Sequence, residues 1–162
     1  MRSDARRNLD SLLGAAAECF AEGGLAVSVD EIARRAGVGH GTVFRRFPTK
    51  GALVEAVLER ELERVALVAQ AALAEEDAWE AFAGFFRSAA DAYARNRVLI
   101  EERERCRALP AAAVLLAAAT ELARRAQEAG ALRGDLTAAE ILELVPAASR
   151  FPDVILDGLR RR

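Results

Sequence analysis

The stretch "AGVGHGTVFRRFPTK", residues 36–50, carries the information that decides this fold. It contains closely spaced glycines, the only histidine of the chain, its only lysine and two adjacent arginines. A short helix that served only a protein core would not have this composition, because core positions favour apolar side chains. The stretch therefore raises the question of what the exposed side of such a helix contacts.

Start and stop signals for helices surround this stretch. Apolar residues follow one helix face over positions 9–20 and end at the glycine pair 23–24, a typical C-cap signal. Residues 28–31 fit the capping box S-x-x-E and predict the start of a second helix. Gly37 then permits a tight turn, and a third helix is predicted from about 39 to 47, before a proline. Three short helices are thus expected before a long fourth one.

The second and third helices have the spacing of a helix-turn-helix unit. Ala33 lets the helices cross closely, Gly37 forms the turn and Val43 anchors the third helix. On a helical wheel at about 100° per residue, Val43 and Phe47 face the core. His40 and Phe44 fall on the border, and the outward face consists of Gly41, Thr42, Arg45 and Arg46.

An outward face with two guanidinium groups has two interpretations. A lone basic pair is ordinarily a solvated helix surface. Here the pair coincides with a helix-turn-helix turn and with a Pro-Thr-Lys junction, which favours contact with the DNA major groove. Arginine binds guanine bidentately and also binds phosphate without reading sequence. Lys50 follows the predicted N-cap Thr49, so its positive charge lies at the positive end of the helix dipole, which is mildly unfavourable. A phosphate bound there would offset this repulsion.

The composition favours one all-helical globular chain. Of 162 residues, 52% are hydrophobic and 30% charged, and prolines and β-branched residues are few. No apolar run is long enough to span a membrane, and no secretory signal follows the N-terminus. Cys19 and Cys106 lie far apart without metal-ligand spacing, which indicates reduced thiols in a cytoplasmic protein.

The charge distribution is mildly asymmetric. Residues 1–50 carry eight Lys/Arg against six Asp/Glu, a net of +2, and residues 51–162 carry fifteen against nineteen, a net of −4. This agrees with nucleic-acid binding by the N-terminal part. No catalytic histidine constellation, phosphate-binding glycine loop or metal-ligand cluster is present in the sequence, so neither an enzyme nor a cofactor is expected.

Residues 9–60 resemble the DNA-binding region of the TetR (tetracycline-repressor) family of bacterial regulators. The matching run is "AAAECFAEGGLAVSVDEIARRAGVGHGTVFRRFPTKGALVEAVL". The family pattern has a helix ending in F-x-x-x-G, then S/T-V-x-x-I-A-x-x-A-G-V-S-x-G-T-[LV]-[YF]-x-x-F-x-x-K-x-x-L. Residues that match it at fixed spacing are Phe20, Gly24, Ser28, Val29, Ile32, Ala33, Ala36, Gly37, Val38, Gly41, Thr42, Val43, Phe44, Phe47, Lys50 and Leu53.

The resemblance implies which residues contact DNA. These are Ser28, His40, Gly41, Thr42, Phe44, Arg45, Arg46 and Lys50. The chain departs from the family pattern at two positions. Gly39 replaces the usual capping serine, and Phe44 replaces the more frequent tyrosine, so that a hydroxyl contact to phosphate is missing.

The resemblance also implies a division into a helix-turn-helix domain, residues 1–52, and a helical effector-binding and dimerisation domain, residues 53–162. The segments "AGALRGDLTAAEILELV" and "RFPDVILDGLRRR" resemble the family's C-terminal dimer helices. Their join at "PAASRFPD" is abrupt for the family. Either the interface is shortened, or connecting residues are missing near Ser149.

An aromatic stripe on a helix predicted at 77–94 is the first candidate for an effector site. A stripe of this kind is ordinarily core, but within the family it is a candidate cavity lining. The predicted effector-binding residues are Trp79, Phe82, Phe86, Tyr93, Leu99, Leu116 and Thr120. Because convergent polar groups are scarce among them, a mostly apolar effector is expected.

The alternating charges of residues 101–107 predict an exposed, salt-bridged helix. A less favoured hypothesis is that Cys106 is a thiolate sensor. The arginines at 103, 105 and 107 would lower its pKa, although nearby glutamates oppose this effect.

Together these features predict a homodimeric, ligand-responsive DNA-binding transcription regulator. We expect a repressor that two helix-turn-helix units hold on a palindromic operator of double-stranded DNA, and that a small-molecule effector releases, without a membrane partner. The alternative is a protein-interaction module that keeps the helix-turn-helix without specific operator binding.

Overall fold

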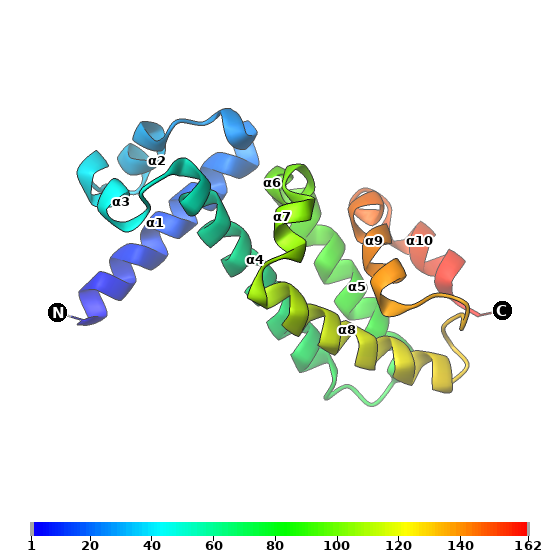
Figure 1. The fold of residues 1–162 in the computed structure, drawn as a ribbon. Coiled ribbons are helices and arrows are strands. Elements are labelled where there is room, and N and C mark those ends of the chain that lie inside the picture. Colours follow the sequence, from blue (N-terminus) through cyan, green and yellow to red (C-terminus); the bar gives the residue numbers. More distant parts are fainter. Residues whose placement is uncertain (1, 162) are drawn as a thin grey trace.

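The structure, a computed structural model, describes residues 2–161 and is built of α-helices (Figure 1). Within these residues the only β pairing is an isolated bridge between Leu132 and Arg160. The predicted all-α class is confirmed. No helix of the described residues is long and apolar enough to cross a membrane.

The N-terminal unit contains the three helices expected before α4, but only the second and third are short, because the first spans 22 residues and is nearly as long as α4. Ser28 Oγ accepts a hydrogen bond from the Glu31 N–H at 3.2 Å, and Gly37 adopts φ +67° in the following turn. Thr49 caps the long helix that follows, by accepting the N–H of Ala52. The elements are α1 (Arg2–Gly23), the short 3₁₀ helix η1 (Gly24–Ala26), α2 (Val29–Arg35), α3 (His40–Arg46) and α4 (Lys50–Ala72).

The remaining helices form a bundle around α4. They are α5 (Ala78–Arg95), α6 (Arg97–Glu101), α7 (Arg103–Arg107), α8 (Pro110–Glu128), α9 (Ala138–Ala148) and α10 (Pro152–Leu159). A complete capping box formed by Thr137 and Glu140 starts α9. Gly130, with φ +71°, follows the end of α8.

One local expectation needs correction. The charged segment 101–107 is not one helix, because Glu102 leaves helical geometry with φ −108° and ψ 29° and separates α6 from α7. Pro146 lies inside α9, which continues to Ala148. A proline that removes one backbone donor is tolerated here, only two residues before the helix ends.

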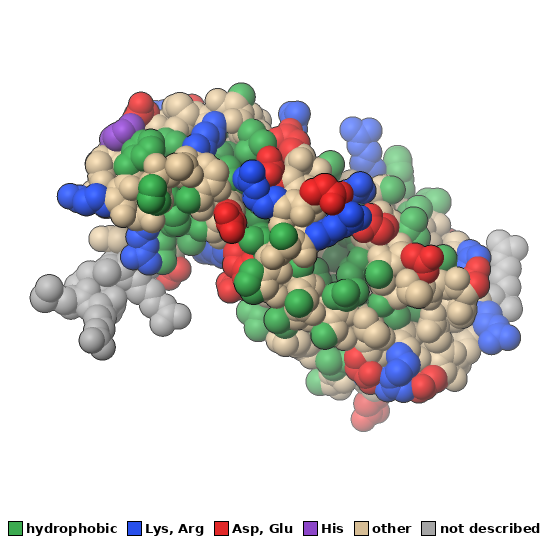
Figure 2. Space-filling view, viewed as in Figure 1, with side chains coloured by type: hydrophobic (Ala, Val, Ile, Leu, Met, Phe, Trp, Pro, Cys, Tyr) green, Lys and Arg blue, Asp and Glu red, His purple; other side chains and the backbone are tan. Residues whose placement is uncertain are grey.

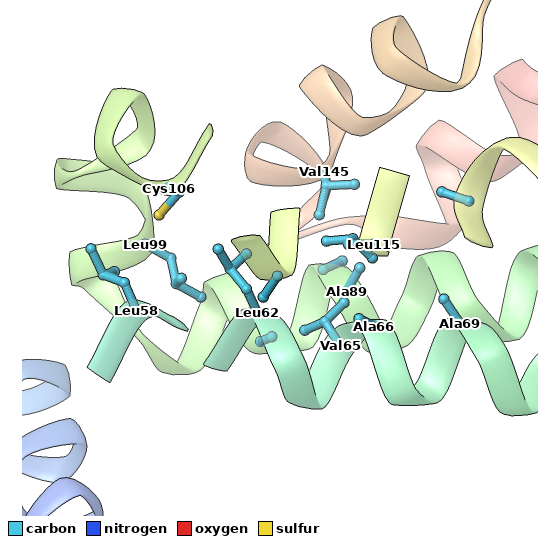
Figure 3. Packing of buried hydrophobic residues seen from close by; sticks show 14 of the residues in the cluster. Leu58, Leu62, Val65, Ala66, Ala69, Ala89, Leu99, Cys106, Leu115 and Val145 are labelled. Atoms are coloured by element: carbon cyan, nitrogen blue, oxygen red, sulfur yellow. The ribbon is translucent and has the colours of Figure 1, made fainter. Parts of the chain in front are cut away.

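The core of the bundle lies mainly between α4 and α8, which pack along their lengths, with α5 and α9 closing its sides. Figure 3 shows Leu62 and Val65 of α4 facing Leu115 and Val145. A second part of the core lies under the helix-turn-helix, where Phe20, Ile32 and Leu53 are fully buried. Both parts use side chains from α4.

The two units meet at α4 and at α6. Helix α4 runs without interruption from the helix-turn-helix into the bundle (Figure 1), so that the predicted boundary between residues 52 and 53 lies in its first turn. That division stays a prediction. Helix α6 packs against α1 and η1, and Arg60 Nη1 of α4 donates to the Asp10 carbonyl at 2.9 Å.

The abrupt join near Ser149 is a tight turn. The Phe151 N–H donates to the Ala148 carbonyl at 3.0 Å, and α10 then packs on α9 and α5. Asp153 of α10 forms an ion pair with Arg87 at 2.8 Å. Phe151 and Val154 remain 66% and 67% exposed in the single chain.

Candidate functional site

The outward face of α3 is arranged as the helical wheel predicts. Val43 is 1% exposed and Phe47 is half-buried, whereas the residues of the outward face, Gly41, Thr42, Arg45 and Arg46, are all exposed. The Arg45 Nη2 group donates to Thr42 Oγ1 at 3.1 Å, one turn earlier on the same helix. This bond holds one guanidinium along the exposed face and leaves most of its donors directed to solvent.

His40 and Phe44 form the edge of this face. Their ring centroids are 4.5 Å apart with planes tilted by 34°, and Phe44 is half-buried while His40 is exposed. His40 Nδ1 pairs with the Asp30 carboxylate of α2. This pair ties the two helices together and places an acidic group next to the predicted DNA contacts. Asp30, whose side chain is 75% exposed, is not among the residues predicted from the sequence to lie at this face.

Lys50 and Ser28 each have a local structural role. The Lys50 ammonium donates to the Leu25 carbonyl of η1, and Ser28 caps α2. Gly39 gives α3 no side-chain cap, as expected where glycine replaces serine. A phosphate contact from Lys50 would have to share the ammonium with Leu25. The DNA-binding assignments of all these residues stay predictions.

A cavity of about 400 Å³ lies in the bundle, bordered by residues of every helix from α4 to α9. Three of the residues predicted to bind an effector line it: Tyr93, Leu99 and Leu116. The others lie elsewhere. Phe82 packs between Trp79 and Phe86 in the core, with centroid distances of 6.0 and 6.1 Å.

Thr120 is also outside the lining. It is exposed, and its hydroxyl donates to the Leu116 carbonyl at 2.7 Å. Trp79 lies at the other end of α5, where the Arg160 guanidinium is 5.0 Å from its ring centroid. The aromatic stripe is therefore core over most of its length, and it reaches the cavity only at Tyr93.

The charged groups at the cavity were not identified from the sequence. Arg103 and Arg107 of α7 and Glu143 of α9 all border it. Arg103 Nη1 is 3.5 Å from Glu143 Oε2, and Arg107 Nη2 bonds the other oxygen, Oε1. Figure 2 shows acidic and basic side chains gathered beside a hollow lined by hydrophobic ones. The alternating charges at 101–107 indicated exposed ion pairs but gave no sign of this partner on another helix.

The thiol of Cys106 is not poised for reaction. Burial raises its pKa to about 11, Glu102 adds to the increase, and Arg105 opposes it only weakly. The neighbouring arginines therefore do not bring the pKa below its ordinary value, because burial outweighs them: Cys106 is 4% exposed and faces the apolar interior (Figure 3). Burial likewise raises the pKa of the Tyr93 phenol to about 12. Among the described residues no group of side chains has the composition of a metal site.

Comparison with known proteins agrees with this geometry. Residues 12–57 match the family model described as bacterial regulatory proteins, tetR family. A TetR transcription regulatory protein from Mycobacterium vanbaalenii is 44% identical, with 98% of each chain covered and a TM-score of 0.73. The TetR transcriptional regulator SCO0520 from Streptomyces coelicolor is 30% identical, over 94% of this chain and 98% of that one, with a TM-score of 0.69. Among curated proteins, none matches the chain.

These relatives span nearly the whole length of the chain, so the likeness includes the bundle as well as the helix-turn-helix. Members of the family are DNA-binding transcription regulators and not enzymes. The family model matches the part of the chain that places arginines on an exposed helix face. The chain belongs to the TetR family of bacterial transcriptional regulators.

Proposed function

We propose that the protein is a cytoplasmic, homodimeric repressor that binds a palindromic operator and is released by a small, mostly apolar effector. The observation that carries the proposal is the presence, in one chain, of an exposed arginine-bearing α3 face and of an apolar cavity in the bundle. The first feature suits a major groove and the second suits a ligand.

On the DNA side, two copies of α3 enter successive major-groove faces. Arg45 and Arg46 supply guanidinium groups for guanine edges and phosphates, and Gly41 allows the helix to approach the duplex closely. Thr42, His40 and Phe44 contribute at the edges of the same face. Lys50 and Ser28 bind the backbone from the adjacent helix starts, where N–H groups also favour phosphate.

On the effector side, Leu99 links the cavity to the DNA-binding unit. It lines the cavity and belongs to α6, which packs against α1 and η1. An effector that prefers a different position of α6 therefore changes the position of the helix-turn-helix relative to the bundle. Release follows if that position cannot span both half-sites, since a ligand shifts the equilibrium by its difference in affinity for the two states.

Exposed apolar residues at the start of α10, its N-cap Phe151 and Val154, support the dimer. Phe151 and Val154 would be costly to leave in water, and a second copy of the chain would cover them. Replacing both with serine should shift the protein to monomer in sedimentation velocity and weaken operator binding. A variant that stays dimeric would place the interface elsewhere.

The central experiment is a titration of the protein with fragments of the DNA upstream of its own gene, at several salt concentrations. We expect one fragment to bind preferentially, with log affinity falling linearly with log salt. Arg45→Ala should reduce the preference among fragments, and Lys50→Ala should weaken all of them alike. Arg64→Ala is the matched control, because Arg64 is exposed on α4, away from α3, and pairs with Glu61 of the same helix. Equal, weak binding to every fragment would instead favour the interaction module.

A further inference from the structure

The mouth of the cavity has a composition that selects one class of ligand. Its apolar wall includes Leu62, Val65, Leu115 and Val145, and its charged groups are Arg103, Arg107 and Glu143. The lining thus carries two guanidinium groups and one carboxylate. Glu104 also pairs with both arginines, at 3.0 Å from Arg107 and 4.0 Å from Arg103, but it is 76% exposed and does not line the cavity.

The Glu143 carboxylate holds both arginines at once. One oxygen contacts Arg103 and the other contacts Arg107, so a single acidic group from α9 bridges two cations one turn apart on α7. The side chain of Glu143 is 45% exposed and those of the arginines 48% and 49%. An ion pair this accessible to water contributes little to stability, so Glu143 can return to solvent at small cost.

Tyr93 adds a neutral donor to the same place. Its phenol responds electrostatically to Cys106, Glu143, Arg103 and Arg107, which puts it close to the charged mouth. Within the part of the chain that the structure describes, no residue forms a hydrogen bond with the Tyr93 hydroxyl. The phenol is protonated at neutral pH, and burial, which raises its pKa to about 12, keeps it so well above that range. Among the residues that line the cavity, two guanidinium groups and one phenol thus share a single carboxylate, that of Glu143, and a ligand can bring a further acceptor.

We propose that the effector is an amphipathic carboxylate, with an apolar body in the cavity and an anionic group that takes the place of Glu143 between Arg103 and Arg107. The inference rests on the proposed function, and names the chemical class of its effector. Arginine binds carboxylates in a planar, often bidentate manner that an amide or alcohol cannot reproduce with equal strength. A cationic ligand would meet two like charges. Displacing Glu143 also breaks the ion pairs that join α9 to α7, so that ligand binding can alter the relative positions of these two helices.

The test measures binding of straight-chain carboxylates, from hexanoate to tetradecanoate, to the full chain by calorimetry at neutral pH without DNA. Amides and amines of the same lengths are the matched probes. At the best chain length we expect the carboxylate to bind roughly tenfold tighter than the amide or more. In the double variant Arg103→Gln/Arg107→Gln, the preference for carboxylate over amide should disappear. Arg105→Gln, which removes an arginine that pairs with Glu102 and does not line the cavity, should keep it.

The Glu143→Gln variant distinguishes a Glu143 carboxylate that the ligand displaces from one that supports the shape of the site. Because the native carboxylate competes with the ligand, its removal should tighten carboxylate binding, whereas a supporting role for Glu143 would weaken it. Circular dichroism checks that each variant folds. Equal binding of amides and carboxylates, tighter binding of amines, no binding of any carboxylate, or weaker binding to Glu143→Gln would overturn the proposal. Operator binding is measured separately, so that a protein that binds carboxylates but no DNA refutes the proposed function and not the ligand class.

Discussion

Gly41 offers a change whose effects on stability and on DNA binding have opposite signs. It is the second residue of α3, it has no positive φ, and a Cβ added there would meet no atom within 4 Å. Gly41→Ala should therefore stabilise the folded chain by about 0.4–1 kcal/mol, mainly because alanine restricts the unfolded chain and favours helix. For a chain of this size, that gain raises Tm by about 1–4 °C.

The same methyl group should weaken operator binding. If the glycine faces the duplex, a Cβ at a close-packed interface costs about 1–3 kcal/mol, as overpacking does in a core. This corresponds to a loss of affinity of roughly 5-fold to 150-fold. Gly41→Leu extends further from the same face and should weaken binding more than Gly41→Ala does.

Thermal unfolding and fluorescence anisotropy with labelled operator measure the two effects. The control is Gly84→Ala on α5, where an added Cβ also meets nothing within 4 Å. It should raise Tm by a similar amount and leave DNA binding unchanged. If Gly41→Ala raises Tm but binds operator within twofold of the original chain, Gly41 does not lie against the duplex. If it lowers Tm, the reasoning about the open space at α3 is wrong.

Three further changes probe local structure and buried ionisable groups. Gly37→Ala should lower the free energy of unfolding by about 1–2 kcal/mol, since φ +67° disfavours any side chain even though the space around it is open; chemical denaturation measures this. Thr137→Ala should cost about 1 kcal/mol in the same assay by removing the cap of α9, and an unchanged midpoint would refute that role. Burial raises the pKa of Cys106 from 9.0 to about 11, so the buried neutral thiol should stabilise the fold fully below pH 9. This stabilisation should be lost as the pH rises to 11. The loss should be smaller in Cys106→Ser. Iodoacetamide should accordingly modify Cys106 slowly in the native protein at pH 8 and rapidly in denaturant.

The helix-turn-helix could be predicted from the sequence because its determinants are local. Ser28 caps α2 three residues before Glu31, Gly37 makes the turn, and Val43 is the apolar anchor, all within sixteen residues. Each signal acts on the backbone next to it and does not depend on the rest of the fold. The orientation of α3 then follows from helical periodicity alone, since only one face of such a short helix can reach the core.

The cavity could not be predicted in the same way, because tertiary packing decides which face of each helix reaches it. Trp79 and Tyr93 lie near opposite ends of α5, yet α8 and α9 leave space only beside Tyr93. The charged mouth depends on Arg107 and Glu143, which are 36 residues apart in the sequence. An alternating charge pattern predicts partners within one helix, such as Glu104, and contains no information about a partner on another helix.

In the proposed mechanism, helix α4 carries a movement at the cavity to the DNA-binding unit without any unfolding of the helix-turn-helix. Its first turn is capped by Thr49 and bound to η1 through Lys50, and two turns or more further along, Leu62 and Val65 line the cavity. A helix of 23 residues is about 34 Å long, so a tilt of about 5° about one end displaces the other by about 3 Å. In a symmetric dimer the two displacements add, whereas operator half-sites lie about 34–36 Å apart with little tolerance. A ligand therefore needs to favour only a slight tilt of α4. A ligand group that replaces Glu143 binds at the opposite side of the same cavity and can favour such a tilt.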